Sequence, residues 1–179
     1  MEFTKVVESR RSIRSYQEGV SIPQADLEAM IKCAQEAPTW KNSQTGRYYV
    51  ISTPKKVKEV IENSLPEFNQ NSSSNASAII VTTFEKNRAG FDREGNPDNE
   101  LGNEWGAYDL GLQNMLLTLK ATELGYDTLI MGIRNSEALR KDLSIADSQE
   151  VVAVIALGKR TSDANKPKRK DLDHIATFF

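Results

Sequence analysis

The sequence has 179 residues, which is enough for one domain that buries its own hydrophobic core. Hydrophobic residues make up 39% and charged residues 27%, and 23 Lys and Arg stand against 25 Asp and Glu, so the net charge is -2. This balance argues against a protein that mainly coats nucleic acid, for which a strongly basic domain is expected.

The few cysteines and histidines exclude several further classes of protein. Cys33 is the single cysteine, so an intrachain disulfide or a zinc site built from several thiolates cannot form. His174 is the single histidine and would have to serve any Ser/His or Cys/His hydrolase alone. The sequence starts without the apolar run of a signal peptide, and its apolar segments are too short to cross a bilayer. We therefore expect a cytoplasmic protein without membrane contact.

The predicted elements are short helices and strands in mixed order. Apolar spacing and helix-breaking residues define them. In the first half of the chain we expect a helix over 3–9, a helix capped by Ser21 in a capping box with Gln24 and ended by Pro38, a strand over 48–51, and a helix opened by Thr53-Pro54. A polar stretch over 69–75 and a strand over 78–84 follow. In the second half we expect a helix over 104–124, an apolar segment over 128–133, a helix capped by Asn135 or Ser136, and a central strand over 151–157.

Three segments suggest how the chain is organised and assembled. Residues 85–102 are rich in Gly, Asn and charge, which predicts a long loop or flexible flap. The 104–124 helix is apolar around most of its circumference and should be buried on all sides, so we expect it to pack against the same helix of a second subunit. Residues 159–179 form a basic extension that ends in Phe178-Phe179 and needs a surface to lie on.

Together these elements predict one α+β domain over residues 1–179. Its core is a mostly antiparallel sheet of four or five strands flanked by helices. We expect this domain to form a dimer through the long helix.

Positive charge gathers near both ends of the chain. Arg10, Arg11, Ser12 and Arg14 offer rigid donor forks and a hydroxyl group, which suit a phosphate, but a solvated charged turn explains them about equally well. The tail carries a second cluster over 166–170, which is also common in exposed tails. If the fold brings the two clusters together, they could neutralise one terminal phosphate.

Two further segments are polar or open enough to face a ligand. Residues 37–44 hold Asn and Gln side chains that can both donate and accept, as the edge of a flat heterocycle requires, although local turns are the favoured explanation of this segment taken alone. Gly125 is explained as a helix C-cap. Gly132 would let a ligand approach the backbone closely.

The order of these pieces resembles the FMN-dependent nitroreductase family. The resemblance rests on Arg-Arg-Ser-Ile-Arg-Ser-Tyr over 10–16, on Ala-Pro-Thr-Trp-Lys-Asn-Ser-Gln over 37–44, on the long helix with Asp109, Gly111 and Asn114, on Leu-Gly-Tyr-Asp-Thr followed by Met-Gly over 124–132, and on Lys-Pro-Lys-Arg-Lys over 166–170. It extends over nearly the whole chain, and the first motif is the most specific.

The resemblance implies which residues hold the cofactor FMN. Arg10 and Ser12 would bind the phosphate with Lys168 and Lys170, with Arg11 and Arg169 nearby, and Arg14 would reach the N1/O2 edge of the ring. Asn69, in preference to Asn71, would face the O2/N3 edge. The other cofactor-binding residues would be Pro38, Thr39, Trp40, Asn42 and Gln44 from the partner subunit, and the backbone of Ile130, Met131 and Gly132 near N5.

This sequence departs from the family pattern at two places. Thr45-Gly46 stands where relatives commonly have proline and tryptophan, and Ser72 stands where some relatives have a lysine near the ring. The first change would loosen the cofactor loop. The second would leave Arg14 with less help in holding negative charge on the ring.

The resemblance also implies an activity. NADH or NADPH would reduce the flavin at N5, and a nitroaromatic or quinone-like acceptor would then be reduced in a ping-pong cycle. The alternatives are a reductive dehalogenase, a 5,6-dimethylbenzimidazole synthase, a non-catalytic flavin-binding protein and, least favoured by the charge balance, a nucleic-acid binder. No catalytic acid, catalytic base or metal ligand stands out.

Overall fold

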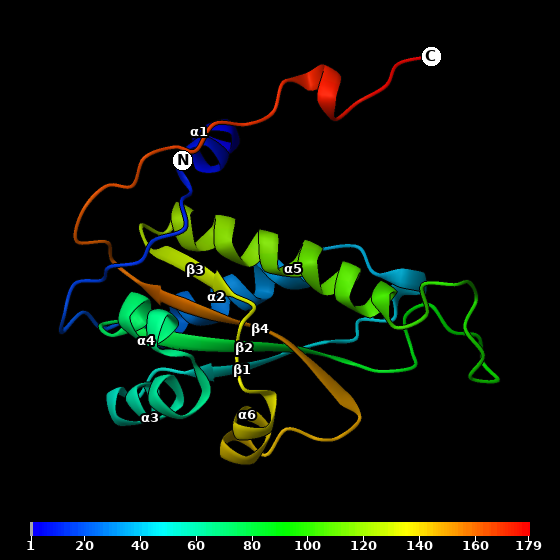
Figure 1. The fold of residues 1–179 in the computed structure, drawn as a ribbon, viewed down its shortest axis with the longest axis horizontal. Helices are drawn as coiled ribbons and strands as arrows, with labels where there is room; N and C mark the ends of the chain where they lie inside the picture. The colour runs from blue at the N-terminus through cyan, green and yellow to red at the C-terminus, as the bar shows by residue number, and fades with distance from the viewer. Residues whose placement is uncertain (1) are drawn as a thin grey trace.

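A single antiparallel sheet forms the centre of the computed structural model, which describes residues 2–179 (Figure 1). Within these residues the strand order is β1-β2-β4-β3, and every neighbouring pair is antiparallel. The predicted fold class is therefore confirmed. The strands are β1 (Gly46–Ile51), β2 (Ala78–Glu85), β3 (Asp127–Met131) and β4 (Gln149–Gly158).

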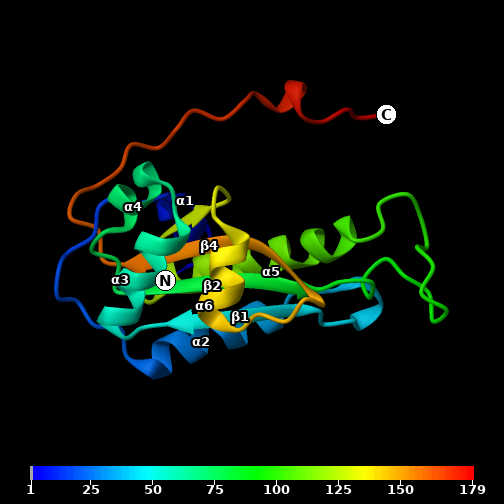
Figure 2. The ribbon, with the colours of Figure 1, turned by 60° about the horizontal axis from the view of Figure 1, so that its bottom comes forward.

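Helices cover both faces of this sheet (Figures 1 and 2). Alternate residues of β2 point to opposite faces, so Ile79 and Val81 join one core cluster while Ala78 and Ile80 join another. The first cluster includes residues of α3 and α6, and the second includes residues of α2 and α5. The helices are α1 (Phe3–Ser9), α2 (Gln24–Gln35), α3 (Pro54–Ser64), α4 (Glu67–Ser73), α5 (Glu104–Glu123) and α6 (Ser136–Leu143), with short 3-10 turns η1 (Trp40–Asn42) and η2 (Leu172–His174).

Two local predictions were wrong. The helix expected after Ser21 begins only at Gln24, because Pro23 is extended (ψ 141°) and occupies the N-cap position. The Gln24 side chain then donates to Glu28 Oε1 (2.8 Å) instead of completing a capping box. The polar stretch expected over 69–75 is mostly the helix α4, whose Asn and Ser residues conceal it because they are weak helix formers.

Only one side of α5 is buried within a single chain. Leu110, Leu117 and Ala121 are fully buried, whereas Tyr108 is 59% and Met115 43% exposed. The expectation that this helix is buried on all sides is therefore not met by one chain. The exposed side presents an apolar surface that a partner could cover.

The loop over 85–102 and the tail over 159–179 differ in how they meet the domain. The loop is folded on itself: Asp98 donates its backbone N–H to Gly90 O (2.8 Å), and Phe91 pairs with Pro97. The tail leaves the end of β4 and extends away from the sheet in an open course, and Phe178 is 81% exposed (Figures 1 and 2).

Candidate functional site

The segment that follows α1 is fixed to the edge of the sheet. Ser12 pairs with Thr128 of β3 in a parallel bridge, and the backbone N–H of Ile13 donates to Thr128 O (3.0 Å). Ile13 and Tyr16 point into the core, whereas Ser12 and Arg14, on either side of Ile13, are exposed. The local alternation thus places the polar side chains of this segment on the surface beside β3.

The tail returns past this segment and closes a pocket of about 360 Å³ over it. The two positively charged ends of the chain therefore do meet. We call this site the arginine pocket, and its lining residues are Arg10, Arg11, Ser12, Arg14, Ala164, Asn165, Pro167 and Arg169.

Positive charge in the arginine pocket is not balanced by a carboxylate from its lining residues. The pKa of Arg10 lies below its ordinary value because of burial and because Arg169 and Arg11 are positively charged neighbours. Arg11 Nη1 donates to the backbone oxygens of Glu8 (2.6 Å) and Arg10 (2.8 Å), which keeps its guanidinium group in place. Several guanidinium groups held together in this way form a site for an anion, and their planar forks suit a phosphate.

Lys168 and Lys170 do not line the arginine pocket. All three residues 168–170 are exposed, but only the side chain of Arg169 lines the pocket. Neighbouring side chains of an extended chain point in opposite directions, which accounts for the difference.

A second group of predicted residues lies at the far end of β3. Ile130 is two residues beyond Thr128, or about 7 Å along the strand, and is 48% exposed. Met131 is buried and belongs to a core cluster. A Cβ atom added to Gly132 would meet no atom within 4 Å, which shows open space beside the backbone there.

Asn69 joins this second group. Its side-chain Nδ2 donates to the backbone oxygen of Ile133 (3.0 Å), and the residue is 8% exposed. Asn71 lies on another side of α4 and lines a separate cavity with Ser74 and Ser77. The fold therefore places Asn69, and not Asn71, beside the 130–133 segment.

The polar loop over 38–44 is shaped by one buried carboxylate. Asp109 of α5 accepts the backbone N–H of Trp40 (2.8 Å), and Lys41, Asn42 and Gln44 adopt positive φ angles of 47°, 55° and 48°. Gln44 donates its backbone N–H to Thr39 Oγ1 (3.1 Å) and its Nε2 to Asn42 Oδ1 (3.2 Å). These bonds hold the loop in one shape.

In one chain the polar loop does not reach the arginine pocket. Asp109 lies near the start of α5, whereas Thr128 follows the end of α5 at Glu123. The helix from Asp109 to Glu123 spans about 21 Å at 1.5 Å per residue. The 38–44 segment, which carries Pro38, Thr39, Trp40, Asn42 and Gln44, therefore lies near the start of α5, apart from the segment that follows α1 (Figure 1). The prediction that they serve the site of another subunit is not tested by a single chain.

Sequence reasoning missed the groups that hold these segments. Burial raises the pKa of Asp109 above its ordinary value, and its hydrogen bond from Trp40 N–H opposes the rise. Lys41 Nζ contacts Asp98 Oδ2 (2.7 Å), which ties the 85–102 loop to the polar loop. A carboxylate well inside an apolar helix was the available signal for Asp109, whereas no feature of the sequence indicated the Lys41–Asp98 pair.

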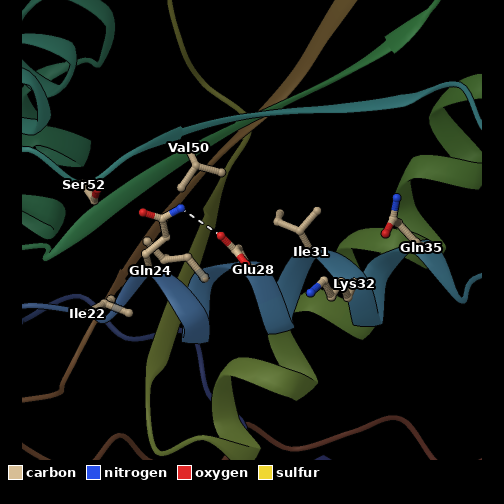
Figure 3. A pocket seen from close by; sticks show the side chains of 9 residues that line it. Ile22, Gln24, Glu28, Ile31, Lys32, Gln35, Val50 and Ser52 are labelled. Atoms are coloured by element: carbon tan, nitrogen blue, oxygen red, sulfur yellow. Dashed lines mark hydrogen bonds between the residues drawn. The ribbon is translucent and has the colours of Figure 1, made fainter.

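A larger cavity, of about 570 Å³, lies between α2 and β1 and contains none of the predicted residues. Figure 3 shows Gln24, Glu28 and Ile31 of α2 facing Val50 of β1. Within residues 2–179 there is no cluster of potential metal ligands. Over the same residues, no helix is long and apolar enough to span a membrane.

Comparisons with known proteins agree in a single family. Residues 7–159 match the Nitroreductase family. YdgI of Bacillus subtilis (strain 168), named provisionally as an NAD(P)H nitroreductase, is 25% identical over 99% of this chain and 97% of its own length.

Solved structures share the fold. CLA-ER, an enone reductase of gut-bacterial fatty acid saturation metabolism, superposes with a TM-score of 0.87 at 21% identity, over 99% of this chain and 97% of its own. A provisionally named nitroreductase from Exiguobacterium sibiricum 255-15, in complex with FMN, superposes with a TM-score of 0.79 at 23% identity, over 100% of this chain and 98% of its own.

Proposed function

Because the chain belongs to the nitroreductase family, we propose that it is an oxidoreductase that binds FMN and uses NADH or NADPH to reduce a small organic acceptor. The observation that carries the proposal is the arginine pocket, in which Arg10 and Arg169 come together from the two ends of the chain. A phosphate there would relieve the repulsion between them. Bound FMN would accept hydride at N5 and pass it on, in a ping-pong cycle, to a nitroaromatic or quinone-like compound.

Residues 130–132, at the end of β3, would hold the ring of the same molecule. Ser12 pairs with Thr128, and the open backbone at Gly132 lies a short way along the same segment. A phosphate in the arginine pocket would therefore leave the attached ring system lying along residues 130–132. Asn69 would contribute a polar group at the edge of the ring, and exposed Arg14 would supply positive charge near N1.

We propose that Lys168 and Lys170 add longer-range attraction for the phosphate, while Arg169 contacts it directly. The two lysines are exposed and flank the residue that lines the pocket.

A homodimer would complete the site. Tyr108 and Met115 expose an apolar surface on α5, and Phe3 and Val7 expose another on α1, which packs against α5. Pairing of two α5 helices would cover these residues and could bring the polar loop of one subunit to the flavin of the other. The tail, with Phe178 and Phe179 exposed, would lie on the partner.

The test is the visible absorption spectrum of the purified protein, before and after NADH or NADPH is added without oxygen. We expect flavin absorption that is bleached by one of the two reductants and restored by a nitroaromatic, quinone or enone acceptor. Halogenated aromatics and free flavin are tested in the same panel. Turnover of a halogenated aromatic would indicate the reductive dehalogenase, and turnover of flavin alone would indicate the 5,6-dimethylbenzimidazole synthase. Bound flavin that neither reductant bleaches would indicate a non-catalytic flavin protein. A colourless protein that takes up no added FMN would overturn the proposal.

A further inference from the structure

An ion pair lies where the tail leaves the sheet, beside the segment that carries the arginines. Asp127 opens β3 and is only 8% exposed. Its carboxylate accepts from Nε of Arg160 (2.9 Å), from the backbone N–H of Arg160 (2.9 Å) and from Nη2 of the same guanidinium group. Arg160 Nη1 also donates to Asp163 (3.1 Å). Several bonds from one residue, on a nearly buried carboxylate, make this pair stronger than an ordinary surface ion pair.

The same residues hold the N-terminal segment. Tyr16 pairs with Arg160 in an antiparallel bridge, and the backbone N–H of Gln17 donates to Lys159 O (2.8 Å). The backbone N–H of Thr161 donates to Ser15 O (3.2 Å). One end of the arginine-bearing segment is thus attached to β3 through Ser12, and the other end is attached to the start of the tail.

Beyond Thr161 the tail has few ties to the domain. Over residues 2–179, the bond from Arg160 to Asp163 is the one hydrogen bond that joins residues 162–179 to the chain before them. Ala164 packs against the core, and five residues later Arg169 faces Arg10. The direction set at Arg160 therefore decides where Arg169 lies.

Like charges oppose this arrangement. Arg10 and Arg169 repel each other, and this repulsion contributes to the lowered pKa of Arg10. The tail would move away from Arg10 unless something fixes its start. The Asp127–Arg160 ion pair can fix the start of the tail, because Asp127 belongs to β3 and Arg160 to the first residues of the tail.

We propose that Asp127 and Arg160 are positioning residues for the arginine pocket, holding the start of the tail so that Arg169 stays close to Arg10. Neither residue touches the pocket, so they act through Arg169. That the ligand of the pocket is the phosphate of FMN rests on the proposed function.

The test compares two flavins that differ in the phosphate alone. Dissociation constants of FMN and riboflavin are measured by quenching of flavin fluorescence for the wild type, Asp127→Asn and Arg160→Gln. We expect both variants to bind FMN about tenfold more weakly, a coupling of ordinary size, while riboflavin binding stays unchanged. Glu123→Gln, which breaks the exposed Lys120–Glu123 pair (2.6 Å), is the matched control and should change neither constant.

A second measurement needs no flavin. Spin labels on Glu8→Cys and Lys166→Cys, in a Cys33→Ser background, report the distance between α1 and the tail. Asp127→Asn should broaden and lengthen this distance, and Glu123→Gln should not.

The outcomes separate this inference from the proposed function. A wild type that binds neither flavin contradicts the proposed function, and the spin-label distance then decides the inference alone. An unchanged distance, unchanged FMN affinity, or an equal loss of FMN and riboflavin in Asp127→Asn and Arg160→Gln would overturn the positioning role.

Discussion

At the scale of single residues, the tail offers a direct comparison between neighbours. Arg169 and Lys168 are both exposed, but only Arg169 lines the arginine pocket. We expect Arg169→Gln to weaken FMN binding by about 2 kcal/mol, or roughly thirtyfold, the usual effect of losing a charged hydrogen bond. Lys168→Gln should have a smaller effect that disappears at high salt. Titrations of FMN at two ionic strengths measure both, and equal losses in the two variants would mean that Lys168 also contacts the phosphate.

Arg14 is the residue proposed to stabilise the reduced ring. It is exposed and makes one weak hydrogen bond, to Ser12 O (3.4 Å), so its guanidinium group can turn to a ligand. Arg14→Ala should lower the flavin reduction potential by about 30 mV, which corresponds to a tenfold weaker hold on the reduced form in a two-electron couple. Spectroelectrochemistry measures the shift. Arg14→Lys keeps the charge and should restore most of the potential, and an unaltered potential in Arg14→Ala would remove this role.

Asp109 should make stability depend on pH. Burial raises the pKa of its carboxyl group, so the folded protein holds this proton more tightly than the unfolded chain does. The free energy of unfolding should therefore fall as pH rises from the ordinary carboxyl pKa, about 3.9, through the raised value, by about 1.4 kcal/mol for each pH unit between the two. The Asp109→Asn variant still offers an oxygen to Trp40 N–H, but its free energy of unfolding should not show this decrease with rising pH. Urea unfolding at a series of pH values, with exposed Asp147→Asn as control, checks the difference, and identical pH profiles for wild type and Asp109→Asn would contradict it.

At the scale of elements, two glycines of α5 differ in whether the fold has room for a side chain in their place. A Cβ atom on Gly106 would lie 2.3 Å from the ring of buried Phe84 in β2, whereas a Cβ atom on Gly111 would meet nothing within 4 Å. Gly106→Ala should lower the free energy of unfolding by about 1–3 kcal/mol through overpacking. Gly111→Ala should raise it by about 1 kcal/mol through helix propensity. Thermal or urea unfolding of this pair tests whether close packing of α5 on the sheet requires Gly106, and a stable Gly106→Ala variant would show that it does not.

The departure of Thr45-Gly46 from the family pattern also has a packing reason. A Cβ atom on Gly46 would lie 2.0 Å from Oε1 of Gln113, and that oxygen accepts a hydrogen bond from Tyr48 (3.0 Å). The Gln113 side chain of α5 thus occupies the space that a larger residue in β1 would need. The expectation of a loosened loop has no support in this contact, because the space is filled.

At the scale of the whole molecule, the proposed dimer can be broken at one position. Met115 is 43% exposed on the apolar side of α5. Met115→Glu should place two charges in the proposed interface, convert the dimer to a monomer, and reduce FMN binding because the polar loop would be withdrawn from the partner's site. Analytical ultracentrifugation and flavin titration measure the two effects. Lys55→Glu, at an exposed position of α3, introduces a glutamate elsewhere on the surface and should alter neither the oligomeric state nor FMN binding. A Met115→Glu variant that stays dimeric would place the interface on another surface.

The sequence by itself determined the elements and their order. The β-branched run over 151–157 predicted β4, because a strand covered on both faces needs apolar side chains in succession. The order of the motifs indicated the family by resemblance. Some of these motifs contain residue types that suit a phosphate or the edge of a flat heterocycle. Local errors arose where the sequence signal is weak, as at α4, or where two signals compete, as at Ser21 and Pro23.

Only the tertiary structure decided which of these residues meet. It placed Asn69, and not Asn71, beside Ile133, and it placed Arg169, and not Lys168, in the lining of the arginine pocket, because the direction of a side chain depends on the path of the backbone around it. It also showed that Asp127 and Arg160, which are 33 positions apart in the sequence, form an ion pair. Contacts between residues distant in the chain follow from packing, which spacing along the sequence does not encode.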